Sequence, residues 1–169
     1  MSQKISFSRI GFRVLSLLTL VAGVLLLISK TAKAADITML LTQDQQQVSS
    51  IVNQQRALNQ ENGVQLDPTL CAIAQAFAYD MYMRSYFSHV SPEGTTMGMR
   101  LRSCNAPYGW AGENIALGQK DSNEVMTTWM NSKGHRDNIL NTHFNRIGVG
   151  HYGNIWVEEF TDGGLRVSN

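Results

Sequence analysis

The chain has 169 residues, with 14 basic and 13 acidic side chains. Five of the basic residues fall within residues 1–34, which contain no acidic residue, so residues 35–169 hold nine basic and thirteen acidic residues and a formal net charge of −4. A mildly acidic domain without a basic stripe repels phosphate backbones, which excludes nucleic acid as an expected partner, and about 135 residues are enough for one hydrophobic core.

The first 34 residues have the pattern of a secretory signal peptide. Basic residues precede an apolar run over residues 14–28, and small residues at Ala32 and Ala34 fit a signal peptidase site. The run is short for a membrane span. We therefore expect cleavage after Ala34 and a secreted protein, extracellular or periplasmic, that meets the membrane only through this segment. An uncleaved anchor is the alternative, and it would also place the rest of the chain outside.

The only two cysteines, Cys71 and Cys104, belong to the exported part. An oxidising compartment would allow them to pair. We expect a disulfide, which would contribute about 3 to 4 kcal/mol by closing the loop between them. The alternative is a cysteine nucleophile that works with a histidine.

Two helices are predicted in the first part of the exported chain. Thr42 and Gln45 have the spacing of a capping box, which opens a helix that we expect to end near Gly63. Asp67 is expected to cap a second helix, with Pro68 at its first position. Apolar residues then recur at helical spacing, so this second helix should face a core.

An irregular segment, residues 86–112, follows and is long for a loop. Long ordered loops in compact domains are often functional. The elements expected from here on are a short helix over 97–101, a strand over 114–117, helices over 123–130 and 134–140, and a hairpin of 147–150 with 155–160. Helices before and between a few antiparallel strands predict a layered α+β domain.

Five short blocks carry a family resemblance. They are Phe87-Ser88-His89, Gly112-Glu113-Asn114-Ile115-Ala116, Trp129-Met130-Asn131-Ser132, Gly134-His135-Arg136-Asp137-Asn138-Ile139-Leu140 and Ile147-Gly148-Val149-Gly150. The blocks occur in the order seen in the CAP superfamily of cysteine-rich secretory, antigen-five and pathogenesis-related-one proteins. The chain therefore resembles this superfamily, and in particular its bacterial branch. The resemblance implies a three-layer α-β-α sandwich with a central antiparallel sheet. The expected organisation is a signal peptide (1–34), a lead-in (35–45), the CAP domain (46–161) and a tail (162–169).

The resemblance also implies a cleft lined by two histidines and two acids. His89, Glu113 and His135 match three of these positions, and the fourth falls on Ser132, which cannot replace a carboxylate as a base at neutral pH. Two imidazoles and a carboxylate can bind a divalent metal, most simply zinc, with water as the fourth ligand. We therefore expect these three residues to be metal ligands. The alternative is that they hydrogen-bond to one another and hold the irregular segment in place.

Two further sets of residues bear on the cleft. Glu158 and Glu159 are adjacent in the last predicted strand and so point to opposite faces of the sheet, and we expect one to lie buried near the cleft and the other in solvent. Trp110, Trp129 and Trp156 are expected in the core or in the cleft wall.

The absence of a recognisable nucleophile motif and of the second acid favours binding over catalysis. The expected function is that of a secreted binding protein for a lipid, a small hydrophobic ligand, or an envelope or host protein, with a cleft that takes a divalent metal. One alternative is a metal-assisted peptidase with Glu113 as the catalytic base. Another is an envelope interaction module with a vestigial cleft.

Overall fold

The computed structural model describes residues 42–164. The expected signal peptide, its cleavage site and most of the lead-in lie outside the described residues, as does most of the expected tail. Between residues 42 and 164, no helix is long and apolar enough to cross a membrane.

A four-stranded sheet forms the centre of the described domain. Its strands are β1 (Gln65–Leu66), β2 (Ala111–Leu117), β3 (Arg146–Tyr152) and β4 (Ile155–Thr161), in the spatial order β1-β3-β4-β2. β4 pairs antiparallel with both β2 and β3, which confirms the predicted hairpin. β1 pairs parallel with β3 and was not predicted, because two residues carry no readable pattern.

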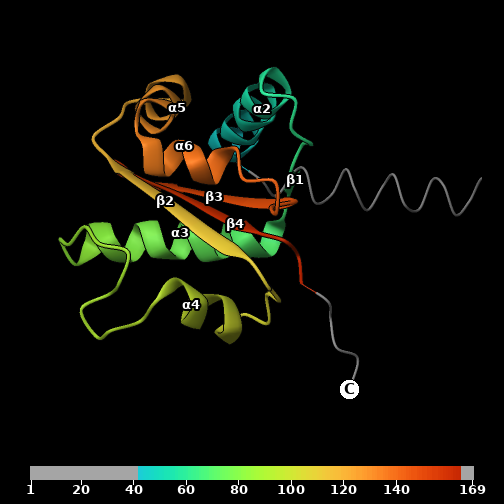
Figure 1. The fold of residues 1–169 in the computed structure, drawn as a ribbon. Helices are drawn as coiled ribbons and strands as arrows, with labels where there is room; N and C mark the ends of the chain where they lie inside the picture. The colour runs from blue at the N-terminus through green and yellow to red at the C-terminus, as the bar shows by residue number, and fades with distance from the viewer. Residues whose placement is uncertain (1–41, 165–169) are drawn as a thin grey trace, which may run out of the picture. The chain divides into compact units, whose positions relative to one another are not determined.

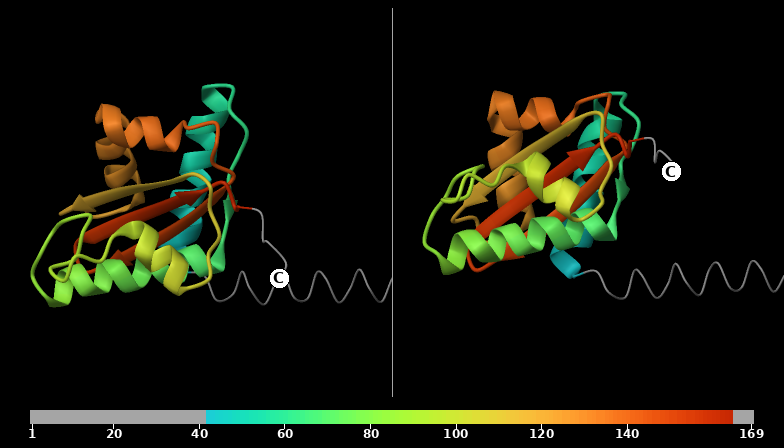
Figure 2. Two further views of the ribbon diagram at one scale, coloured as in Figure 1. Left: turned by 60° about the horizontal axis from the view of Figure 1, so that its bottom comes forward. Right: turned by 90° about the horizontal axis from the view of Figure 1, so that it is seen from below.

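Helices cover both faces of the sheet (Figure 1). On one face lie α3 (Pro68–Met83) and α4 (Met97–Ser103), and on the other lie α2 (Gln43–Leu58), α5 (Ser122–Asn131) and α6 (Lys133–Ile139). The two turned views in Figure 2 show α4 beside α3 on the same side of the sheet. The predicted three-layer sandwich is therefore confirmed.

The first two described helices begin where their capping residues predict. The Thr42 hydroxyl accepts from the Gln45 amide at 3.3 Å, and the Gln45 side chain accepts from the Thr42 amide at 2.9 Å, which completes a capping box. Asp67 caps α3 by accepting from the amides of Thr69 and Leu70. α2 ends at Leu58, earlier than expected.

Each face of the sheet has its own apolar core. Trp129 of α5 packs with Val149, Trp156 and Phe160 on the face covered by α2, α5 and α6. Phe77 and Met81 of α3 pack with Ile115, Ile155 and Val157 on the other face. Residues on β4 thus alternate between the two cores, as the two-residue period of a strand requires.

Two glycines let α3 lie close against β3. A β-carbon at Gly148 would come within 2.1 Å of the Leu70 backbone, and one at Gly150 within 2.2 Å of the Ala74 backbone. Backbone atoms in a packed helix cannot yield as the end of a flexible side chain can. These glycines therefore set the distance between α3 and the sheet.

The cysteines do not pair. Cys71 is buried on α3, and its sulfur accepts a hydrogen bond from the Val149 amide at 3.4 Å, so this thiol is directed at the sheet. Cys104 is exposed at the end of α4, and both cysteines are free thiols. The expected disulfide is therefore wrong for this structure. Burial also raises the pKa of the Cys71 thiol to about 11, which disfavours it as a nucleophile at neutral pH.

Gly150→Ala tests the close packing of α3 on β3. We expect it to destabilise the protein by roughly 1 to 3 kcal/mol, because the added methyl group meets helix backbone. Gly134→Ala is the matched control: Gly134 is exposed in α6 with no atom within 4 Å of the new β-carbon, so stability should stay the same or rise slightly. Urea unfolding of the two variants measures the difference, and equal stabilities would contradict the packing argument.

Candidate functional site

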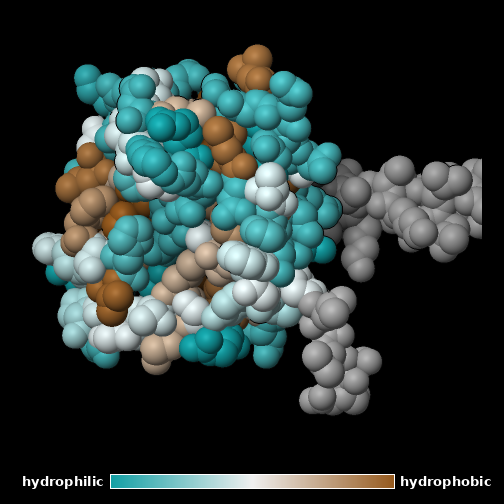
Figure 3. Space-filling view, in the orientation of Figure 1, coloured by the Kyte–Doolittle hydropathy of each residue, from teal (hydrophilic) through white to brown (hydrophobic). Residues whose placement is uncertain are grey.

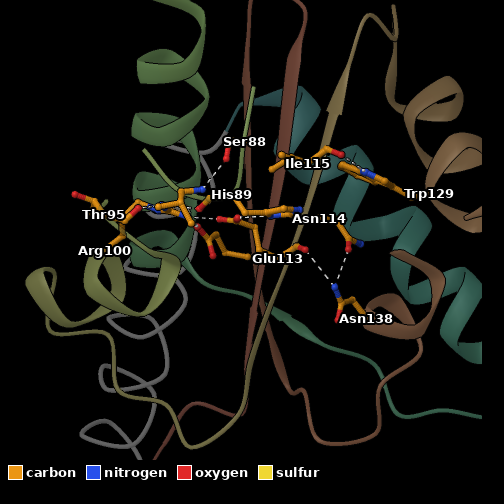
Figure 4. Close-up of polar contacts among 11 residues, drawn as sticks. Ser88, His89, Thr95, Arg100, Glu113, Asn114, Ile115, Trp129 and Asn138 are labelled. Atoms are coloured by element: carbon orange, nitrogen blue, oxygen red, sulfur yellow. Dashed lines mark hydrogen bonds and ion pairs between the residues drawn. The ribbon is translucent and has the colours of Figure 1, made fainter. Parts of the chain in front are cut away.

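The candidate site is centred on Glu113, in the edge strand β2. Nδ1 of His89 lies 2.7 Å from one carboxylate oxygen of Glu113, and the guanidinium of Arg100 forms an ion pair with the other (Figure 4). The Glu113 side chain is only 4% exposed, whereas that of His89 is 54% exposed. Glu113 is thus an internal acceptor, and His89 is the group of the pair that solvent reaches.

Arg100, on α4, holds the irregular segment against this acid. Its side chain is 12% exposed, and its guanidinium lies over the ring of Phe77, 3.5 Å from the ring centre. It also donates to the carbonyl oxygen of Thr95 at 3.3 Å and lies 3.5 Å from the carbonyl oxygen of His89. One cation therefore connects α3, α4, β2 and the loop that carries His89.

The two adjacent glutamates of β4 are both fully buried, so the expectation that one would be solvated is wrong. Glu159 lies opposite Glu113 in the strand register, and one of its oxygens is 3.7 Å from the Arg100 guanidinium. Glu158 lies opposite Asn114 and accepts a hydrogen bond from its amide at 3.0 Å. Both sheet faces are covered by helices, which leaves no solvated face for either side chain.

Burial shifts the pKa of both glutamates upward. Desolvation raises the pKa of Glu158 to about 8, with the Asn114 hydrogen bond opposing it. For Glu159, burial raises the pKa well above its usual range, the negative charge of Glu113 raises it further, and Arg100 opposes both. Neither group has the ordinary acidity of a glutamate.

Side chains from α5 and α6 form hydrogen bonds to the backbone of β2, which is an edge strand of the sheet. Asn138 donates to the carbonyl oxygen of Glu113 at 3.2 Å, and the indole of Trp129 donates to that of Ile115 at 3.3 Å (Figure 4). Asn114 donates to the carbonyl oxygen of His135 at 3.1 Å. An edge strand presents unpaired backbone groups; two carbonyl oxygens of β2 are satisfied here, and these contacts fix α6 against the strand.

His135, on α6, is half-buried on the same edge of the sheet. Burial lowers the pKa of its imidazole, and the nearby charge of His89 lowers it further. The Nδ1 atom is buried without a hydrogen-bond partner. The structure thus brings the three residues expected in the cleft to one edge, with a direct hydrogen bond only from His89 to Glu113 among the contacts described.

A divalent metal does not fit these residues as they are arranged. Both oxygens of Glu113 are taken, one by a cationic guanidinium that would repel a metal ion. Among residues 42–164, no three histidine, cysteine, aspartate or glutamate side chains are grouped so that they could hold a metal ion. The zinc site predicted from the sequence stays a prediction.

Sequence reasoning missed Arg100 and Asn138 as parts of the site. Asn138 stands inside one of the family-like blocks, so its position was a usable signal. Arg100 stands in the irregular segment, and no local pattern pairs it with Glu113.

Two other residues named from the sequence take no part in these contacts. Ser132 lies between α5 and α6, and its side chain caps neither of these helices. Trp110, expected in the core or cleft wall, is 55% exposed and stacks on His143.

Comparisons with known proteins find similar sequences and structures. The sequence model of the cysteine-rich secretory protein family, CAP, matches residues 50–157. The chain is 42% identical over 118 residues to the protein YkwD of Bacillus subtilis, covering 69% of this chain and 46% of that protein. It spans less than half the length of the curated relatives it matches.

Two solved structures have the same fold. An extracellular protein with an SCP domain from Bacillus anthracis superposes with a TM-score of 0.68 at 34% identity, covering 70% of this chain and 40% of that one. An outer surface protein of Borrelia burgdorferi superposes with a TM-score of 0.63 at 24% identity, and the match covers 67% of this chain and 87% of that one. The second likeness concerns the fold alone.

The raised pKa of Glu158 predicts a pH-dependent stability. Between the ordinary glutamate range and about pH 8, the unfolded chain releases this proton while the folded protein keeps it, so stability falls as pH rises through that window. Glu158→Gln should make the fall shallower. Urea unfolding at intervals from pH 5 to pH 8.5 measures both slopes, and identical slopes would contradict the assignment.

A calorimetric zinc titration at pH 7.5 tests the metal prediction. With Arg100 on Glu113, we expect no binding near one equivalent by the native protein or by a His89→Ala, His135→Ala double variant. Binding at one equivalent that the double variant loses would show that the histidines ligate zinc and that Arg100 leaves Glu113.

Proposed function

Because this chain belongs to the cysteine-rich secretory protein family, we propose that it is an extracellular binding protein for a small hydrophobic ligand. The observation that carries this proposal is a groove between α3 and α4 with a volume of about 460 Å³. That volume lies in the range of small-molecule sites. The extracellular location is supported by the Bacillus anthracis relative, which is described as extracellular.

The groove has an apolar floor and two different ends. Its floor is formed by one face of α3, with Ala72, Ile73, Ala76 and Phe77. At one end lie uncharged residues, including Thr69 and Ser103, and at the other the charged residues Asp80, Arg84 and Glu93. A ligand with an apolar body and one polar end matches this distribution, because apolar surface is stabilised on the floor and a polar end keeps partners at the rim.

An ion-pair network holds the charged end in place. Arg84, at the end of α3, donates to Asp80 at 3.3 Å and to Glu93 at 3.0 Å. Glu93 belongs to the loop between α3 and α4, so the network ties that loop to the helix beside the groove. Exposed pairs of this kind stabilise weakly, which allows the loop to move when a ligand enters.

Another hollow, along α2 near α5, fits a hydrophobic ligand poorly. It is lined mainly by glutamines, including Gln43, Gln46, Gln47 and Gln54. Figure 3 shows a largely hydrophilic surface over α2, with hydrophobic residues at its upper end and along the left margin of this view. The apolar floor of the α3–α4 groove therefore favours that groove as the ligand site.

The state of Glu113 supports binding over hydrolysis. A general base must come within hydrogen-bond reach of the proton that it removes, so substrate or water must be able to approach it. Both oxygens of Glu113 are engaged by His89 and Arg100, and the carboxylate is almost fully buried. A mechanism with Glu113 as base would first have to break a buried ion pair, which is costly.

Blocking the groove tests the proposal. Ala76→Trp places an indole on the apolar floor, and we expect it to weaken binding of an environment-sensitive fluorescent acyl probe at least tenfold. Ala57→Trp, on the exposed side of α2, adds the same side chain away from the groove and should leave binding unchanged. Failure of the native protein to bind the probe, or equal binding by both variants, would contradict the proposal.

A further inference from the structure

The hollow between α2 and α5 is polar, and none of its lining residues is charged. It has a volume of about 680 Å³, and the two helices pack next to each other on one face of the sheet (Figure 1). All but one of the lining side chains carry an amide or a hydroxyl group, which both donate and accept hydrogen bonds. The lining residues are Gln43, Gln46, Gln47, Ser50, Ile51, Gln54 and Asn123.

The two charged residues of α2 are both engaged away from this hollow. Asp44 pairs with Nδ1 of His151 on β3 at 2.7 Å. Arg56 is fully buried and donates to backbone carbonyl oxygens, including that of Ile139. Charged side chains are the usual occupants of a solvated helix face. The outer face of α2 therefore differs from an ordinary solvated face, because amides stand where charges are expected.

The amides form a stripe along α2 with one apolar contact inside it. Gln43, Gln47 and Gln54 are exposed, and their spacing places them on one side of the helix. Ile51 is half-buried and packs against the core beneath, so only part of its side chain reaches the hollow. A sugar ring has hydroxyl groups around its rim and C–H groups on its faces. It can therefore bond to the amides while one face lies on the isoleucine.

We propose that this hollow binds a neutral oligosaccharide. A sulfated or carboxylated polysaccharide would find no cation in the lining, and the exported part of the chain is acidic overall. An extended peptide is recognised through a sheet edge or through pockets for its side chains, and this hollow is lined by helices. The site lies on the opposite face of the sheet from the α3–α4 groove, so it does not rest on the function proposed for that groove.

NMR titration with two neutral sugars tests the proposal directly. The probes are the tetramers of N-acetylglucosamine and of glucose, added to protein labelled with nitrogen-15. We expect at least one tetramer to shift the side-chain amide signals of Gln47 and Gln54, and a sulfated heparin tetrasaccharide to bind at least tenfold more weakly. No shift of these signals with either tetramer, or equally tight binding of the sulfated sugar, would overturn the proposal.

Removing two amides from the hollow provides the matched test. The Gln47→Ala, Gln54→Ala double variant should bind the sugar about tenfold more weakly, because two hydrogen-bonding groups are lost. Alanine favours the helix, so the variant should fold. Gln55→Ala is the control, since Gln55 is on the same helix but does not line the hollow. Native affinity in the double variant, or an equal loss in Gln55→Ala, would overturn the proposal.

Discussion

The guanidinium of Arg100 lies between two buried carboxyl groups, those of Glu113 and Glu159, and over the ring of Phe77. Its other donors reach the carbonyl oxygens of the loop that carries His89. A guanidinium suits this position because its planar fork stacks on an aromatic ring while it donates in several directions. This one cation thus joins the buried Glu113, the carboxylate that orients His89, to the part of the loop that holds His89 and Thr95.

The same residue links the two places where a ligand could be held. Arg100, Phe77 and Thr95 line the groove between α3 and α4, and all three also take part in the contacts that hold the cleft acid. The groove is therefore lined in part by the side chains that contact Glu113 or hold the loop beside it. A cation supplied by the chain itself gives Glu113 its counter-ion, which supports the proposal of binding at an apolar surface over chemistry at a free carboxylate.

Local patterns predicted individual elements, because capping residues and strand alternation act within a few residues. The caps at Thr42 and Asp67 and the hairpin of β3 with β4 were predictable in this way, whereas the three-layer sandwich was implied by the family resemblance. The predictions that failed concern features that depend on contacts between distant segments. The cysteines do not pair because α3 directs the thiol of Cys71 at the sheet. Glu158 and Glu159 are both buried because helices cover both faces, which a two-residue period cannot show, and the pairing of Arg100 with Glu113 exists only after the loop has folded over the sheet.

A double-mutant cycle between Arg100 and Glu113 tests the central claim, that this buried ion pair holds the cleft together. Arg100→Met, Glu113→Gln and the double variant are unfolded in urea at pH 7.5. Each single substitution leaves a buried charge without its partner, so each should cost about 3 kcal/mol or more, and the double variant should cost clearly less than the two together. Costs that add to within about 0.5 kcal/mol would contradict the claim, because they would show that the two side chains stabilise the fold independently.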